Sequence, residues 1–106
     1  CYILILVMRL TNCRNAARLE AGAMDVSLAS ATKVYGSESV VEVLHRLMDI
    51  VGSSSLVRGG SAAAYLMGEL EYELRAAPIN TFGGGTNEIQ RELIAQFGLG
   101  MPRPQR

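Results

Sequence analysis

The stretch VVEVLHRLMDIV, residues 40–51, decides the fold class of this 106-residue chain. Its apolar residues recur three or four positions apart and form one stripe: Val40, Val43, Leu44, Leu47, Met48 and Val51. That spacing is typical of an amphipathic α-helix. Glu42 and Arg46 follow on the other side in the order that favours a helical ion pair. We therefore predict a long helix that begins near Asp25 or Ser27, either a plausible N-cap.

The segment before it predicts another helix, over residues 2–20. It opens with seven apolar residues, too few to span a bilayer, which needs about 20. No basic region precedes this run, so it is a poor signal peptide. Gly22 is a suitable stop for the helix. Because the run at 2–8 is apolar on all sides, we expect an exposed apolar patch that favours self-association.

Two shorter helices are expected in the second half of the chain. One covers 62–76, with Ser61 as its cap. The other runs from a cap at Thr86 or Asn87 to about residue 97, and Asn87 with Gln90 three residues later resembles a capping box. No strand-type alternation persists, so the predicted fold is all-α, a four-helix up-down bundle.

Composition and residue counts argue against several classes of function. Ten basic and ten acidic residues give a net charge of +0, so no nucleic-acid partner is expected. The two cysteines are too few for a disulfide scaffold, which favours a reduced, cytoplasmic protein with Cys13 as a small buried thiol. With His45 as the one histidine, no metal site is expected. The serines at 53–55 lack a matching His/Asp pair, so a serine nucleophile is not expected.

The stretch FGGGTNE, residues 82–88, is the strongest candidate for a binding site. Glycines let a backbone approach a ligand closely. The helix that follows begins with free N–H groups, which favour an anionic or polar ligand. Thr86, Asn87 and Glu88 stand where side chains could face that ligand. The alternative is a mobile loop that feeds a capped helix. No lysine follows the glycines, which excludes a Walker-type phosphate loop.

Residues 82–91, FGGGTNEIQR, with the tail GLGMPR at 98–103, strongly resemble the C-terminal end of acyl-CoA dehydrogenases. Residues 29–52 and 74–77 resemble earlier parts of the same domain. The resemblance implies an FAD enzyme that removes hydrogens from Cα and Cβ of an acyl-CoA thioester, in fatty-acid or steroid side-chain β-oxidation. It further implies that 1–106 is a C-terminal helical domain, incomplete at its N-terminal side, that assembles with identical or different dehydrogenase subunits.

The resemblance also assigns site residues. It places substrate beside Gly84 and Gly85, and FAD beside Thr86, Asn87 and Glu88. The turn at Gly52 and Ser53 would contact FAD of a neighbouring subunit, although the family often has Gly-Gly there and Gln in place of Asp49.

Many members of the family carry the catalytic Glu at the position of Gly84, which has no base. We therefore name no catalytic residue in this chain. The base would come from an upstream segment or another subunit. The alternative is a non-catalytic helical subunit or interaction module that assembles with dehydrogenase chains.

Overall fold

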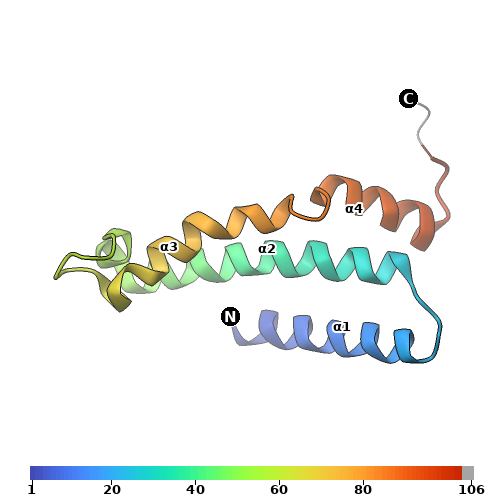
Figure 1. The fold of residues 1–106 in the computed structure, drawn as a ribbon, viewed down its shortest axis with the longest axis horizontal. Coiled ribbons are helices and arrows are strands. Elements are labelled where there is room, and N and C mark those ends of the chain that lie inside the picture. Colours follow the sequence, from blue (N-terminus) through green and yellow to red (C-terminus); the bar gives the residue numbers. More distant parts are fainter. Residues whose placement is uncertain (104–106) are drawn as a thin grey trace.

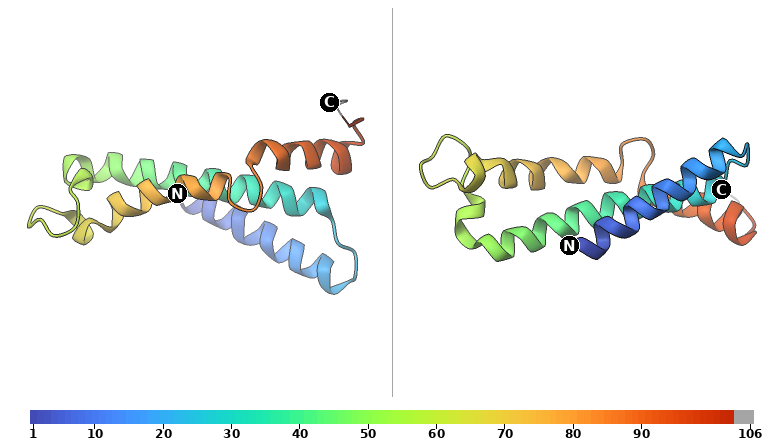
Figure 2. Two further views of the ribbon diagram at one scale, coloured as in Figure 1. Left: turned by 45° about the horizontal axis from the view of Figure 1, so that its top comes forward. Right: turned by 90° about the horizontal axis from the view of Figure 1, so that it is seen from below.

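The computed structural model describes residues 1–103. Its long central helix is α2 (Val26–Val51), and α1 (Tyr2–Glu20) lies antiparallel to it on one side. On the other side α3 (Glu69–Ala76) and α4 (Asn87–Leu93) follow one another along α2 (Figures 1 and 2). Within the described residues the fold has four α-helices and no strand, which confirms the all-α prediction. α2 is the element against which the other three pack.

Short helical turns connect or extend these helices. Three of them are 3₁₀-helical: η1 (Gly52–Leu56), η2 (Tyr65–Gly68) and η3 (Ala77–Thr81). The fourth, η4 (Ile94–Gly98), is a π-helical continuation of α4, so the last helical stretch ends close to the predicted residue.

The hairpin of α1 and α2 forms as its sequence predicts. Gly22 adopts a φ of 69° just after α1. Asp25 is the N-cap of α2, and its Oδ1 accepts the backbone N–H of Leu28 at 3.0 Å. Ser27 donates its hydroxyl to the same oxygen at 2.7 Å, and Arg18 of α1 pairs with the other carboxylate oxygen at 2.7 Å. Asp25 is therefore the cap, and Ser27 assists it.

The third helix begins later than predicted. Ser61 accepts a hydrogen bond from the N–H of Ala63 and caps only a local turn, and α3 starts at Glu69. The reason is a backbone contact, because a Cβ on Gly68 would lie 2.2 Å from the nitrogen of Gly59. The chain turns back on itself here, with Leu66 in a left-handed conformation (φ 48°). The prediction of a helix over 62–76 is wrong in its first half.

The buried core lies where α2 meets η3, α3 and α4, and it is small. Val34, Leu70 and Ala77 are the buried apolar residues among those described, and Ser30, Ser37, Ser39, Ser55 and Asn87 are the buried polar ones. Serines let neighbouring elements approach α2 closely because they are small. The predicted apolar stripe is less buried, since Val40 and Leu47 remain 36% and 37% exposed. Val40, Val43 and Leu44 face a groove of about 190 Å³ beside α1.

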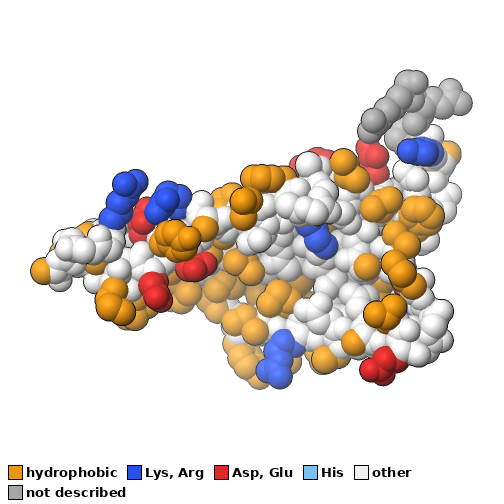
Figure 3. Space-filling view, viewed as in Figure 1, with side chains coloured by type: hydrophobic (Ala, Val, Ile, Leu, Met, Phe, Trp, Pro, Cys, Tyr) orange, Lys and Arg blue, Asp and Glu red, His pale blue; other side chains and the backbone are white. Residues whose placement is uncertain are grey.

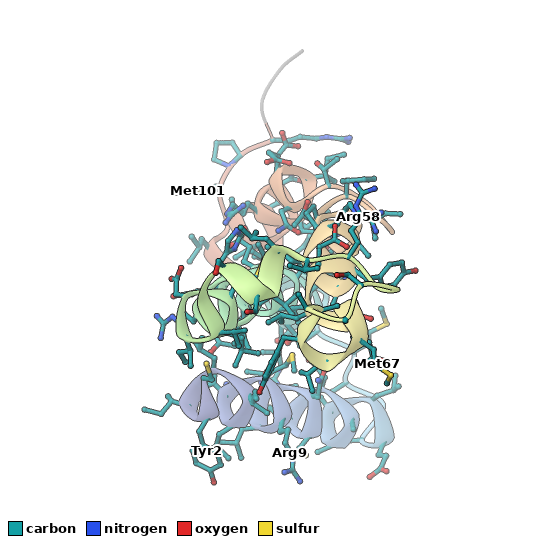
Figure 4. All side chains as sticks on the ribbon, turned by 90° about the vertical axis from the view of Figure 1, so that its left-hand side faces the viewer. Tyr2, Arg9, Arg58, Met67 and Met101 are labelled. Carbon is teal, nitrogen blue, oxygen red and sulfur yellow. The ribbon has the colours of Figure 1, made fainter. Side chains whose placement is uncertain are left out.

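Helix α1 contains no buried residue. Tyr2 and Arg9 point away from α2 (Figure 4), and Cys13 is exposed, so the prediction of a buried thiol is wrong. The radius of gyration is 17.4 Å, against about 13 Å for a compact domain of this length. Hydrophobic side chains are spread over the surface in Figure 3. Among the described helices, none has the length and apolar character to cross a membrane.

Candidate functional site

The glycine loop connects η3 to α4. It begins with a turn in which the N–H of Gly83 donates to the carbonyl of Ile79 at 2.8 Å. Gly84 and Gly85 then adopt φ values of 70° and 102°. Side-chain-bearing residues rarely take these angles, so glycine is required for the chain to enter α4 in this direction.

Thr86 caps α4. Its hydroxyl oxygen accepts the backbone N–H of Ile89 at 3.3 Å, and its backbone is extended (φ −64°, ψ 155°). Of the two predicted caps, Thr86 is therefore the correct one. The side chain of Gln90 donates to the carbonyl of Gly84 at 3.4 Å instead of completing a capping box with Asn87. The interpretation of Asn87 and Gln90 as a capping box is wrong.

Asn87 is 3% exposed, and its side chain faces α2. Its Oδ1 accepts from Lys33 Nζ at 2.7 Å and from the Ser37 hydroxyl at 3.2 Å. Its amide nitrogen donates to Ser37 and to Glu38, both at 3.0 Å. The side chain is thus engaged within the chain, and only the backbone of this predicted cofactor-binding residue is left to meet a ligand.

Lys33 is the residue of this site that sequence reasoning missed. Its ammonium donates to the carbonyls of Thr81 at 3.0 Å and Gly85 at 2.8 Å, as well as to Asn87 Oδ1 at 2.7 Å. We refer to this set of three hydrogen bonds as the Lys33 anchor. A signal was present in the sequence, because Lys33 is the one lysine beside nine arginines and stands among the small residues of α2.

Glu88 lies in the first turn of α4 and is exposed. Its own backbone N–H, followed by the hydroxyl of Thr86, lowers the pKa of the Glu88 carboxyl below its usual value. One turn further, Arg91 pairs with Glu38 of α2 at 2.7 Å. The start of α4 therefore carries an ionised carboxylate at neutral pH and is tied to α2 by an ion pair.

The second predicted cofactor contact, at Gly52 and Ser53, lies at the far end of α2. Gly52 has a φ of 74°, and both residues are exposed. The buried Ser55 holds this turn by donating its hydroxyl to the carbonyl of Gly52 at 2.6 Å. Lys33 and Gly52 are 19 residues apart, roughly 28 Å at about 1.5 Å per helical residue. The structure does not bring the two predicted sets together within one chain.

Other candidate chemistry is absent from the described residues. No group of three or more His, Cys, Asp or Glu residues there could hold a metal ion. His45 is exposed, and its Nδ1 lies 2.9 Å from the carbonyl of Val41 in its own helix. Gly84 presents no side chain, so the loop carries no general base at that position.

Comparisons with known proteins agree on one family. Residues 1–99 match the model of the acyl-CoA dehydrogenase C-terminal domain. The chain is 46% identical over 78 residues to acyl-CoA dehydrogenase FadE26 and 39% identical over 82 residues to FadE29, both of Mycobacterium tuberculosis (strain ATCC 25618 / H37Rv). Each alignment covers 74% of this chain and 20% of the relative, so the chain spans about a fifth of their length.

Solved structures give the same result. The Tcur3481-Tcur3483 steroid ACAD matches with a TM-score of 0.92 at 39% identity, over 97% of this chain and 27% of that one. The ChsE4-ChsE5 complex from Mycobacterium tuberculosis matches with a TM-score of 0.89 at 38% identity, over 97% of this chain and 26% of that one. The chain therefore belongs to the acyl-CoA dehydrogenase family and corresponds to the C-terminal helical domain of its members.

Proposed function

We propose that this chain forms the C-terminal part of an FAD-dependent acyl-CoA dehydrogenase. Such an oxidoreductase removes a proton from Cα and a hydride from Cβ of an acyl-CoA thioester. Loop 82–88 would contribute one side of the flavin and substrate site. The observation that carries the proposal is that this loop, which resembles the family's sequence except at Gly84, is held in shape by the half-buried Lys33 and the buried Asn87 while Gly84 stays exposed.

The loop leaves space for a ligand beside Gly84. A Cβ built on Gly84 would meet nothing within 4 Å, so the outer side of the loop is open. Gly84 and Gly85 would border the thioester, while Thr86, Glu88 and the backbone of Asn87 would border the flavin. When bound, FAD supplies the oxidant that takes up the hydride. The chain's own part is to bind and orient.

The peptide between Gly85 and Thr86 determines which backbone group of the loop faces outward. In a trans peptide the C=O and the following N–H point in opposite directions. The carbonyl of Gly85 points to Lys33 inside the chain. The N–H of Thr86 consequently points outward, away from α2. We propose that this N–H is one donor for a polar group of the ligand, such as the thioester carbonyl.

The distant pair Gly52 and Ser53 requires a second molecule. A turn roughly 28 Å along α2 from Lys33 would reach the flavin of a neighbouring subunit, whether identical or different. The extended shape supports such an assembly. The chain exposes 7522 Å², whereas a compact protein of its mass exposes about 5,800 Å². The excess, about 1,700 Å², is about twice the roughly 800 Å² that each partner buries in a standard interface.

The base that removes the α proton is not assigned to this chain, because a carboxylate within hydrogen-bond reach of the substrate is required and Gly84 provides none. We propose that another segment or subunit supplies it. The Tcur3481-Tcur3483 relative is named as a steroid acyl-CoA dehydrogenase, so a steroid side-chain thioester is the substrate class to test before fatty acyl thioesters. The free cysteines fit the cytoplasmic location expected from the sequence.

A second candidate is a non-catalytic subunit that assembles with dehydrogenase chains. It is favoured by Gly84 in place of a base and by the exposed apolar residues of α1, such as Tyr2 and Ile3, which are 76% and 72% exposed. The two candidates differ in what the complete protein holds. If the protein is a dehydrogenase, it contains flavin that is bleached when an acyl-CoA substrate is added, and substitutions in loop 82–88 change this bleaching. If it is a non-catalytic assembly partner, substitutions in this loop leave the flavin of the complex unaffected.

The experiment uses the complete protein with its partner subunits and two matched variants. Gly84→Ala and Gly22→Ala both place a Cβ at a positive φ, 70° and 69°, with nothing within 4 Å. The two variants are therefore matched in φ and in free space around the new methyl group. We expect Gly84→Ala to weaken flavin binding or slow flavin bleaching by roughly tenfold, because only its methyl group meets the ligand. Equal behaviour of the two variants, or a complete protein without flavin, would contradict the proposal.

A further inference from the structure

We propose that Lys33 is a positioning residue, which acts through the backbone of loop 81–87 to fix the ligand-facing side of that loop. This inference rests on the proposed function for the identity of the ligand. The structural part stands on the contacts of Lys33 alone. The Lys33 anchor joins α2 to residues 48 to 54 positions away in the sequence.

The three acceptors match the chemistry of an ammonium group. A lysine ammonium has three N–H donors, and each has one acceptor here, at 2.7, 2.8 and 3.0 Å. The acceptors come from different points: Thr81 before the glycines, Gly85 within them and Asn87 after them. One side chain thus holds the beginning, the middle and the end of the loop.

The anchor restricts the conformation of the glycines together with two other hydrogen bonds, from the Gly83 N–H to Ile79 and from Gln90 to the Gly84 carbonyl. Residues 83–85 have no side chains, and glycine has the largest backbone freedom of any residue. The bond from Lys33 to the Gly85 carbonyl sets the orientation of the peptide between Gly85 and Thr86. It therefore sets the outward direction of the Thr86 N–H.

The second support of the loop works through Asn87. Its amide is buried and bonds to Ser37 and Glu38 as well as to Lys33. Asn87 is thereby placed so that its Oδ1 completes the acceptor set of Lys33. A planar guanidinium cannot reproduce three converging bonds from one nitrogen, so arginine is not an equivalent replacement.

The test compares Lys33→Met, Lys33→Arg and a control in the complete, flavin-loaded protein. The control is Arg46→Met, which removes an exposed cation of α2 that pairs with Glu42. We expect both Lys33 variants to lose roughly 10- to 100-fold in kcat, with a smaller change in KM, because the misplaced groups act at the reacting thioester. The control keeps wild-type values. Wild-type kinetics in Lys33→Arg would overturn the requirement for three converging bonds.

A second measurement does not depend on activity. An amine-acylating reagent, followed by mass spectrometry of the peptide that contains Lys33, reports whether the ammonium is engaged. We expect acylation in the folded protein to be slower than in the urea-unfolded protein by roughly tenfold or more. We also expect faster amide hydrogen exchange at residues 82–86 in Lys33→Arg than in Arg46→Met.

The outcomes separate the two proposals. Equal acylation rates in the folded and unfolded protein would overturn the Lys33 anchor, even if Lys33→Met failed to fold. A wild-type protein that holds no flavin and oxidises no acyl-CoA would instead overturn the proposed function. In that case, slow acylation of Lys33 would still support its role in shaping the loop.

Discussion

The two glycine turns of this chain, at 82–86 and at 52–55, are built in different ways. The first is held by side chains of α2, through hydrogen bonds between residues as many as 54 positions apart. The second is held by Ser55, three residues from the carbonyl that it contacts. The comparison teaches that the chain shapes the first turn through its tertiary fold. The second is a local helix end that leaves Gly52 and Ser53 exposed.

The largest expected effect comes from breaking the support of the first turn. Asn87→Leu removes the buried amide that bonds to Lys33, Ser37 and Glu38, and puts an apolar side chain in its place. We expect the free energy of unfolding to fall by about 3 kcal/mol, since hydrogen bonds to charged groups, here Lys33 and Glu38, contribute about 1.5–3 kcal/mol each. Urea denaturation measures this. The control is Asn80→Leu at an exposed site of η3, and similar stabilities of the two variants would refute the special role of Asn87.

A smaller effect is expected at the cap of α4. Thr86→Ala removes the hydroxyl that accepts the N–H of Ile89, and the loss of such a cap costs about 1 kcal/mol. Thr86→Ser retains the hydroxyl and should restore most of this stability. Thermal unfolding of both variants checks the prediction. If alanine and serine gave the same midpoint, the cap would contribute nothing.

Removing the support of the second turn should reduce the free energy of unfolding less. Ser55→Ala removes one hydrogen bond to the Gly52 carbonyl, which can turn to water because Gly52 is exposed. We expect a loss of about 0.5 kcal/mol in the free energy of unfolding. Ser53→Ala, at an exposed neighbouring position, should change it even less. A loss at Ser55 as large as that at Asn87 would remove the distinction between the two turns.

The smallest expected effect is on the stability at acidic pH, through the carboxyl group of Glu88. The pKa of Glu88 is lowered in the folded chain by its own N–H and the Thr86 hydroxyl. Its stabilising effect is complete above the unfolded pKa, about 4.3, and is lost as the pH falls through the lower folded value. We expect wild-type stability to decrease below about pH 4 more steeply than that of Thr86→Ala. Parallel pH curves would show that the Thr86 hydroxyl does not act on Glu88.

Local patterns predicted most of the helices. The ends of α1 and the regions of the two caps depend on neighbours within a few residues, so local sequence predicted them. The structure then selected Asp25 over Ser27 and Thr86 over Asn87. The start of α3 was predicted wrongly because it depends on the contact between Gly59 and Gly68. That contact forms only when the chain turns back, and no helical periodicity records it.

The candidate site was predicted in outline only. The glycines at 84 and 85 and the cap at Thr86 follow from residue type. The inward orientation of Asn87 does not, because its partners Lys33 and Ser37 lie at least 50 residues away. Sequence patterns along one helix predicted an apolar core, whereas the most buried part of α2 is lined by serines, where close approach matters more than apolar area.

The long sequence separation within the Lys33 anchor has a consequence for the order of folding. The hairpin of α1 and α2 closes over a short turn and is joined by local contacts such as Asn15 to Thr32, 17 positions apart. Contacts between distant residues form later, because a longer loop must be closed first. We therefore expect the helical hairpin to form before loop 82–86 takes its final shape. During synthesis, that loop can take its final shape only after nearly all of the described residues have left the ribosome.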